Sequence, residues 1–191
     1  MIQLIDKPLE GLILFKNTIH RDRRGFFLET YTERETKALG IEDRFVQENH
    51  SCSSHGVLRG LHFQNIYAQA QIVRVIKGEI YDVAVNINPR SSDFGKYFGV
   101  FLKAENYEQF YMSADYAHGF LVLSEEAQIL YKCSQYYHPE DEDGIIYNDK
   151  TVNINWPLAR IKGDVIISEK DLTYASFADY TRRVSIVKEI K

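Results

Sequence analysis

Hydrophobic and polar residues alternate along much of the chain, most clearly at residues 71–89, QIVRVIKGEIYDVAVNINP. After Gly78, one set of alternate positions holds Ile80, Asp82, Ala84 and Asn86, and the other holds Tyr81, Val83, Val85 and Ile87. A period of two puts successive side chains on opposite faces of a strand. The pattern therefore predicts two strands joined by a hairpin turn at Lys77 and Gly78, with Pro89 ending the second strand.

Similar short runs recur between turn residues along the chain. They predict strands over residues 11–17, 25–31, 45–51, 57–64, 96–104, 108–114, 118–124, 127–137 and 144–149. Many short strands with regular turns are typical of an all-β sandwich or barrel. We therefore expect an all-β fold of the jelly-roll barrel type, formed by residues 1–191 as a single domain.

Helical signals are few. Residues 32–40, TERETKALG, predict a short helix after the N-terminal strands, because Thr32 and Glu35 match a capping box and Gly40 suits a left-handed C-terminal residue. The stretch SEKDLTYASFADY, residues 168–180, is interpreted as a loop that can include a short helix. The sequence thus predicts a short C-terminal tail.

Composition limits the classes of function. The 191 residues carry a net charge of −4, with 45% hydrophobic and 26% charged residues, as in ordinary soluble globular proteins. This charge argues against a general binder of nucleic acid or anionic membranes, although a few pocket arginines can still hold a phosphate. No apolar run is long enough to span a bilayer, and the start, MIQLIDKPLEG, lacks the pattern of a signal peptide. We expect a cytoplasmic protein.

His62 lies in the stretch RGLHFQ, which is predicted to be a strand. A histidine at this position can be a packed core side chain, a metal ligand or a general base, and the residue type leaves these three roles open. A metal site lacks an evident third ligand, because the residue two positions on is Gln64 and His118 would be only a second histidine. Cys52 and Cys133 form no CxxC or Cys/His cluster, so they predict neither a disulfide framework nor a zinc site.

The sequence also lacks the GxSxG, GxGxxG and GxxxxGKS/T motifs of serine hydrolases, dinucleotide-binding proteins and NTPases. General acid–base chemistry with ordinary side chains remains. Polar residues that a barrel strand could point inward are Gln47, Asn49, Arg59, His62, Gln71, His118 and Tyr131. The residues alone indicate a soluble β-barrel and leave open whether it holds an enzyme pocket.

Between Leu12 and Asp171, a series of sequence blocks indicates one enzyme family. The blocks are, in order, DRRGFFLETY, FVQENHS, GVLRGLHFQ, GEIYDVAVNI, AENYEQFYM, AHGFLVLS, YKCSQYYHPEDEDGI, NINWP and ISEKD. With RGLHFQ, AHGF and YKC in this order, the chain resembles the dTDP-4-dehydrorhamnose 3,5-epimerase family of the cupin superfamily. The resemblance implies a metal-free cupin-type jelly roll, usually a homodimer, that acts on a nucleotide-linked 4-keto-6-deoxyhexose without a cofactor.

The implied reaction inverts C3 and C5, the two carbons that flank the C4 ketone. It needs a base on one face of the sugar, an acid on the other, and stabilisation of the charge on O4. By motif, the resemblance implies that His62 in RGLHFQ is the base and that Asp171 in ISEKD orients it. Tyr131 in YKC is implied as the acid that reprotonates the far face.

The resemblance also implies substrate-binding roles. Arg59 would meet the diphosphate and Tyr137 would stack on the nucleotide base, and some contacts would cross from the neighbouring subunit. The other positions implied to contact substrate are Arg24, Glu29, Gln47, Asn49, His118, Glu142 and Lys170.

Gln71 departs from the family pattern, which usually reads AQxK where this chain reads AQAQ. A glutamine amide can donate a hydrogen bond to O4 but lacks the charge of an ammonium group. Either Gln71 suffices with help from His118, or the substrate or the number of inverted centres differs. The alternatives are therefore a 3- or 5-monoepimerase, an epimerase of another nucleotide ketosugar, a sugar-nucleotide-binding module without activity, and a metal-dependent cupin enzyme.

Overall fold

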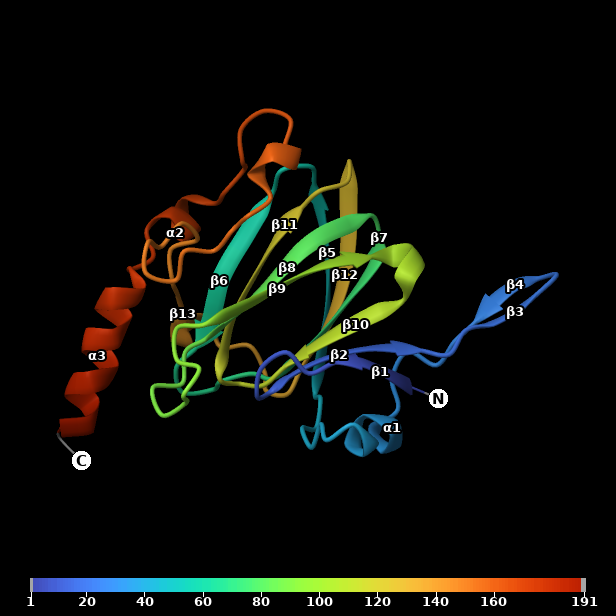
Figure 1. Cartoon of the computed structure of the whole chain (residues 1–191), viewed down its shortest axis with the longest axis horizontal. Helices are drawn as coiled ribbons and strands as arrows, with labels where there is room; N and C mark the ends of the chain where they lie inside the picture. The colour runs from blue at the N-terminus through green and yellow to red at the C-terminus, as the bar shows by residue number, and fades with distance from the viewer. Residues whose placement is uncertain (1, 190–191) are drawn as a thin grey trace.

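The computed structural model describes residues 2–189, and its body is formed by two facing antiparallel sheets (Figure 1). The six-stranded sheet has the order β1 (Ile2–Asp6), β2 (Leu12–Asn17), β10 (Glu108–Met112), β7 (Gln71–Lys77), β12 (Glu126–Cys133) and β5 (Gln47–Ser54). The five-stranded sheet has the order β13 (Glu142–Gly144), β6 (Leu58–Gln64), β11 (Tyr116–Val122), β8 (Glu79–Asn86) and β9 (Tyr97–Lys103). The prediction of an all-β, jelly-roll-like barrel is confirmed.

The alternation in β8 reflects burial on both faces of the five-stranded sheet. Ile80 and Ala84 pack between the sheets, in a core cluster that includes Val73 of β7. The intervening positions, represented by Tyr81 and Val83, pack on the other face in a second cluster. A strand buried on both sides needs apolar residues on both faces, and β8 has them at five of its eight positions, with Asp82 as a buried exception.

The predicted hairpin at Gly78 is wrong, because β7 and β8 belong to different sheets. Gly78 has a φ of +80°, and a Cβ at this position would lie 2.1 Å from the carbonyl oxygen of Glu126. Only glycine fits such a close approach in this conformation. The chain therefore crosses from one sheet to the other within a single residue, and a period-two pattern cannot distinguish this crossing from a hairpin.

The predicted early helix is present as α1 (Glu33–Ala38), and Gly40 after it has the expected positive φ of +93°. The capping box is wrong, since the side chain of Thr32 makes no capping hydrogen bond. With the segment around it, α1 covers the outer face of the six-stranded sheet, where Ile41 packs with Phe15 and Ile72.

In place of the short tail expected from the sequence, the described residues after β13 include two helices, α2 (Glu169–Leu172) and α3 (Phe177–Glu189). Ser176 caps α3 by accepting a hydrogen bond from the N–H of Asp179 at 3.1 Å. Phe177 and Tyr180 pack into the cluster on the outer face of the five-stranded sheet. Phe177 and Tyr180 are three residues apart, a spacing that could have predicted α3. The loop-like residues before them obscured this pattern.

Short 3₁₀ helices are η1 (Ala104–Asn106), η2 (Pro139–Asp141) and η3 (Leu158–Arg160).

A two-stranded hairpin, β3 (His20–Asp22) and β4 (Gly25–Phe27), projects from the body of the protein (Figure 1). Phe26 and Phe27 on it are 53% and 66% exposed. Within residues 2–189, no helix is long and apolar enough to cross a membrane.

Candidate active site

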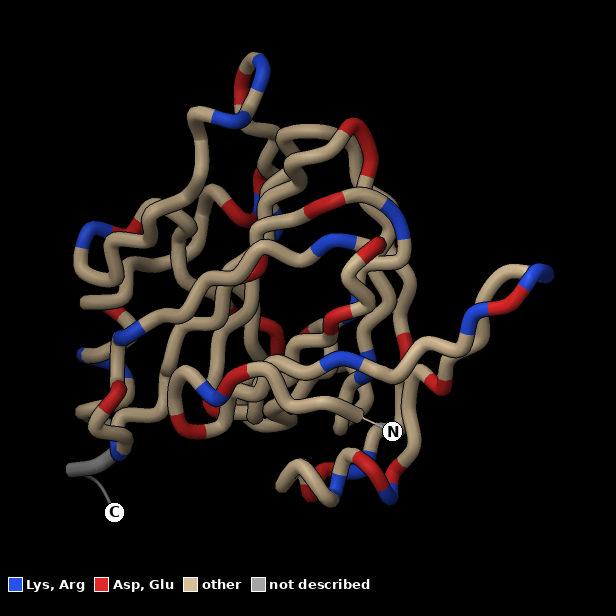
Figure 2. The backbone as a smooth tube through the Cα atoms, turned by 45° about the vertical axis from the view of Figure 1, so that its right-hand side comes forward, with Lys and Arg blue, Asp and Glu red and all other residues tan. Residues whose placement is uncertain are grey.

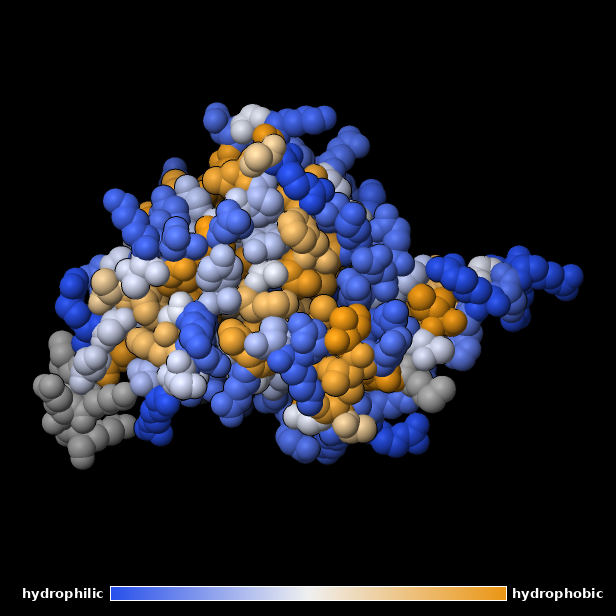
Figure 3. Space-filling model, viewed as in Figure 1, coloured by the Kyte–Doolittle hydropathy of each residue, from blue (hydrophilic) through white to orange (hydrophobic). Residues whose placement is uncertain are grey.

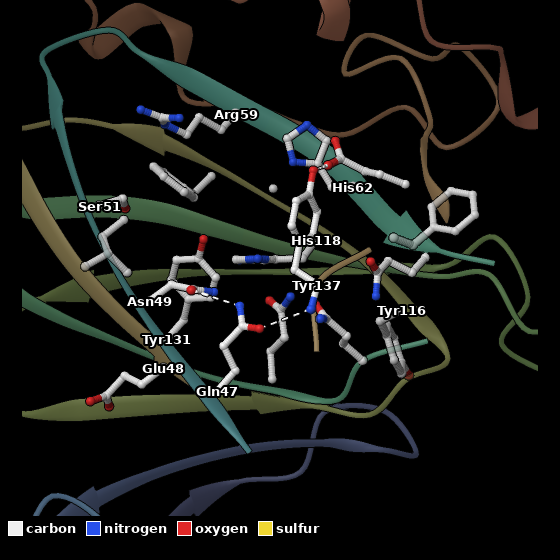
Figure 4. Close-up of a pocket in the computed structure, with 18 of the residues that line it drawn as sticks. Gln47, Glu48, Asn49, Ser51, Arg59, His62, Tyr116, His118, Tyr131 and Tyr137 are labelled. Atoms are coloured by element: carbon white, nitrogen blue, oxygen red, sulfur yellow. Dashed lines mark hydrogen bonds between the residues drawn. The ribbon is translucent and has the colours of Figure 1, made fainter. Parts of the chain in front are cut away.

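A cavity of about 590 Å³ lies in the barrel and is lined by residues of both sheets (Figure 4). Most of the residues predicted from the sequence meet there: Gln47, Asn49, Arg59, His62, Gln71, His118, Tyr131, Tyr137 and Glu142. Lining residues that the sequence did not single out include Ser51, Gln69, Tyr116 and Phe120. Such a volume suits a small-molecule ligand.

His62 lies on β6, and Asp171 of α2 contacts one nitrogen of its ring. Nε2 of His62 is 3.0 Å from Oδ1 of Asp171, and the N–H of Gly60 donates to Oδ2 at 3.1 Å. Asp171 itself is only 4% exposed. Burial by itself raises the pKa of Asp171, but the hydrogen bond and charge of His62 and the Gly60 N–H outweigh it and leave the pKa below its usual value.

An ionised Asp171 can only accept hydrogen bonds, so it fixes a proton on Nε2 of His62. The lone pair then lies on Nδ1, the nitrogen that can take a proton from a ligand. This arrangement suits a general base whose tautomer is set by a buried carboxylate.

Tyr131 lies on β12 in the six-stranded sheet, whereas His62 lies on β6 in the five-stranded sheet. Both side chains line the cavity, so they approach a bound ligand from different sheets. Burial raises the pKa of the Tyr131 phenol, an effect that the charge of Arg59 and the amide of Asn49 partly reduce. The phenol is thus protonated at neutral pH and able to donate.

His118 on β11 lies directly opposite His62 on β6 in the strand register. Its Nε2 is 3.0 Å from both carboxylate oxygens of Asp82, a residue with 0% exposure. Asp82 was not among the site residues predicted from the sequence. The sequence does place this carboxylate among the apolar side chains of β8. Because a buried carboxylate needs a partner, that position could have predicted a paired Asp82.

Glu142 on β13 accepts three hydrogen bonds. Lys170 donates to Oε1 at 2.7 Å, Tyr174 donates to the same oxygen at 2.9 Å, and the Tyr137 hydroxyl donates to Oε2. Burial raises the pKa of Glu142, but these three bonds outweigh it and leave the pKa below its usual value. The bond to Glu142, followed by burial, raises the pKa of Tyr137 to about 12. Lys170 therefore holds Glu142 rather than lining the cavity.

Gln47 and Asn49 form an ordered pair on β5. Nε2 of Gln47 donates to Oδ1 of Asn49 at 2.9 Å, and the backbone N–H of Tyr137 donates to Oε1 of Gln47 at 3.0 Å (Figure 4). The amide nitrogen of Asn49 is therefore directed away from Gln47, and it reaches Sγ of Cys133 at 3.7 Å. These bonds tie the loop that carries Tyr137 to the cavity wall.

Gln71 and Arg59 line the cavity with unused hydrogen-bonding capacity. Oε1 of Gln71 is buried and has no hydrogen-bond partner among the described residues. The guanidinium of Arg59 donates from Nε to Oγ of Ser53 at 3.1 Å, and that bond leaves its two terminal nitrogens for an anion.

Arg24 and Glu29 do not line the cavity of their own chain. Arg24 follows Asp22 at the turn of the hairpin β3–β4 and pairs with it at 2.5 Å, and Glu29 is exposed beyond β4. Among residues 2–189, no three His, Cys, Asp or Glu side chains form a group that could hold a metal ion.

Residues 6–179 match the family model described as dTDP-4-dehydrorhamnose 3,5-epimerase. A protein of that name from Methanothermobacter thermautotrophicus is 46% identical over 169 residues, which cover 88% of this chain and 91% of the relative.

Solved structures with the same architecture include two sugar epimerases with bound ligands. The dTDP-6-deoxy-D-glucose-3,5-epimerase from Legionella pneumophila, in complex with dTDP-4-keto-L-rhamnose, matches with a TM-score of 0.88 and 42% identity over 94% of this chain and 97% of that chain. A 3'-monoepimerase from Streptomyces bikiniensis, in complex with dTDP-quinovose, matches with a TM-score of 0.85 and 29% identity over 93% of this chain and 89% of that chain.

Proposed function

The chain belongs to the dTDP-4-dehydrorhamnose 3,5-epimerase family, and on that premise we propose that it converts dTDP-4-dehydro-6-deoxy-D-glucose to dTDP-4-dehydro-L-rhamnose by inverting C3 and C5. The observation that carries the proposal is the pairing of His62 with buried Asp171 on one wall of the cavity, with Tyr131 on the other sheet.

His62 acts as the base in this proposal. The C4 ketone acidifies the hydrogens on C3 and C5, and Nδ1 of His62 takes one of them to give an enolate with its charge on O4. Asp171 stabilises the imidazolium that forms, because an ionised carboxylate already lies at hydrogen-bond distance from Nε2.

Tyr131 acts as the acid on the opposite face. Its phenol gives a proton to the enolate carbon, the ketone reforms, and the configuration at that carbon is inverted. Proton exchange with solvent then returns His62 and Tyr131 to their starting states. Because an inversion needs two groups on different faces, their location on different sheets supports these roles.

The negative charge on O4 needs a donor, and Gln71 and His118 are the two candidates. With Nε2 held by Asp82, His118 can donate to O4 from Nδ1 only in its protonated form, which would also supply the positive charge that Gln71 lacks. Gln71 adds a neutral hydrogen bond. This division of roles makes the absence of a lysine at position 71 compatible with the reaction.

The nucleotide part of the substrate lies toward the mouth of the cavity in this proposal. Arg59 binds the diphosphate, Tyr137 stacks on the base, and Gln47 and Asn49 hold the loop that positions Tyr137. Glu142 and Lys170 orient Tyr137 through its hydroxyl.

We propose further that the enzyme is a homodimer in which the hairpin β3–β4 reaches a second copy. The hairpin projects from the body, and its tip is basic, with Arg23 and Arg24 (Figure 2). Phe26 and Phe27 lie exposed on the same hairpin, and the space-filling view shows a hydrophobic patch on this projecting part of the molecule (Figure 3). Burial of these rings against a partner would place Arg24 and Glu29 at the partner's cavity.

The monoepimerase alternative is the second candidate function, because Gln71 replaces the expected lysine. One observation favours double inversion: the 3,5-epimerases compared are 34–46% identical to this chain, against 28–29% for the monoepimerase. A binding module without activity has no need for a base and an acid on different walls.

Incubation with dTDP-4-keto-6-deoxyglucose in D₂O, followed by NMR and mass spectrometry, tests the proposal. Deuterium at both C3 and C5 is the expected result, and His62→Asn abolishes it while dTDP binding persists. Deuterium at one carbon would establish a monoepimerase. No exchange, with dTDP still bound, would establish a binding module, and loss of exchange after chelation would establish a metal-dependent enzyme.

A further inference from the structure

His62 contacts a second residue of the C-terminal segment besides Asp171. The ring of Tyr174 packs on the imidazole with the ring centroids 5.6 Å apart and an interplanar angle of 69°. The hydrogen bond to Asp171 fixes one atom of the imidazole but leaves the ring free to tilt about that bond. An aromatic ring against the imidazole restricts this tilt.

Tyr174 is itself held at both ends. Its hydroxyl donates to Oε1 of Glu142 at 2.9 Å. Its ring lies on Gly144, where a Cβ would be 2.6 Å from two ring carbons, so β13 fits the ring closely. The adjacent Ala175 accepts a hydrogen bond from the N–H of Ile146 at 3.0 Å, which fixes the backbone next to Tyr174.

We propose that Tyr174 is a positioning residue that sets the plane of the His62 imidazole, so that Nδ1 faces the reacting carbon. The proposal rests on the proposed function, in which His62 is the base. Glu142 links this contact to the nucleotide end of the cavity, because the same carboxylate accepts hydrogen bonds from Tyr174 and Tyr137.

The charged and titratable groups around this contact come from several elements. They are Asp171 and Lys170 of α2, Glu142 of β13, Arg59 of β6, His118 of β11 and Tyr137 of the loop before η2. A shift of the imidazole changes its distance to each of them, and therefore changes the pH at which the base becomes protonated.

The test compares Tyr174→Leu, which removes the ring, with Tyr174→Phe, which keeps it. We expect Tyr174→Leu to lower kcat by about 10- to 100-fold with little change in KM, since a small misplacement of a catalytic group has effects of this size. The pH profile of kcat shifts as well, and Tyr174→Phe restores most of the activity. Tyr180→Phe is the matched control, because its hydroxyl donates to the carbonyl of Ile87 at 2.9 Å, in a different part of the fold.

An unchanged kcat and pH profile in Tyr174→Leu would overturn the proposal. It would also be overturned if Tyr180→Phe lost as much activity as Tyr174→Leu for the same decrease in melting temperature. The ¹⁵N and ¹H resonances of the His62 ring, measured without substrate, keep the test independent of the reaction. If the parent protein catalyses no exchange, the proposed function fails, whereas unmoved His62 resonances in Tyr174→Leu reject the positioning role itself.

Discussion

His62 and Asp171 are 109 positions apart in the chain, and Nε2 of the first lies 3.0 Å from Oδ1 of the second. The bond joins β6, inside the barrel, to α2, in the segment that follows the last strand. The C-terminal segment therefore contributes a side chain to the candidate active site.

Replacing Asp171 with asparagine tests this relationship. The amide no longer fixes the proton on Nε2 or stabilises an imidazolium, so we expect kcat to fall by about 10²- to 10⁴-fold while dTDP binding is retained. Steady-state kinetics and calorimetry provide the measurement. Asp149→Asn alters another buried carboxylate, one that accepts backbone N–H groups, and is expected to affect stability but not the chemical step.

The pH dependence of stability follows from the lowered pKa values of Asp171 and Glu142. A carboxyl whose pKa is lower in the folded state stabilises the protein above its unfolded pKa, about 4, and loses this effect as the pH falls through the folded pKa. We expect the free energy of unfolding to decline below about pH 4, with a shallower decline in Asp171→Asn. Urea unfolding at a series of pH values measures it, and parallel curves for the two proteins would contradict the linkage.

Removal of the Tyr131 hydroxyl separates proton abstraction from reprotonation. In Tyr131→Phe the base is intact but the acid is lost, so we expect net inversion to fall by about 10²- to 10⁴-fold, with wash-out of substrate hydrogen less affected. Comparison of epimer formation with deuterium exchange measures the difference. Tyr111→Phe removes a hydroxyl that donates to Asp43 at 2.6 Å on the other face of the same sheet, and should leave both rates unchanged.

Gln71→Met should change activity and stability in opposite directions. The substitution removes a buried oxygen that lacks a partner among the described residues, which should raise the free energy of unfolding by about 1 kcal/mol. It also removes a donor to O4, and we expect kcat/KM to fall about tenfold. Gln128→Met, on the outer face of β12, serves as the control. A fall in both quantities would indicate that Gln71 supports the fold instead.

The exposed rings of the hairpin β3–β4 should hold the dimer together. We expect light scattering to report a dimer for the parent protein and a monomer for Phe26→Ser with Phe27→Ser, accompanied by loss of turnover without loss of the β-sheet signal in circular dichroism. Phe101→Ser, which alters a 44% exposed phenylalanine on β9, is the control. A dimeric, active double variant would rule out this interface.

The strands were predictable because alternation reports local burial, and β2, β5–β12 all overlap the predicted ranges. The change of sheet at Gly78 was not predictable, because a glycine turn between two strands is compatible with a hairpin and with a crossing to another sheet. The pairing of His62 with Asp171 came from the resemblance of sequence blocks, since spacing alone gives no indication that they meet. Asp82 and Tyr174 were missed because their roles depend on neighbours in other strands. The homodimer and the cytoplasmic location stay predictions.

Because Asp171 lies in α2, translation adds it after all the strands of the two sheets. A ribosome has translated every strand of both sheets before it adds α2, because β13 ends at Gly144. A chain terminated before α2 thus contains every residue that lines the cavity and still lacks the carboxylate of Asp171. Only a chain translated through α2 carries the complete pair of His62 and Asp171.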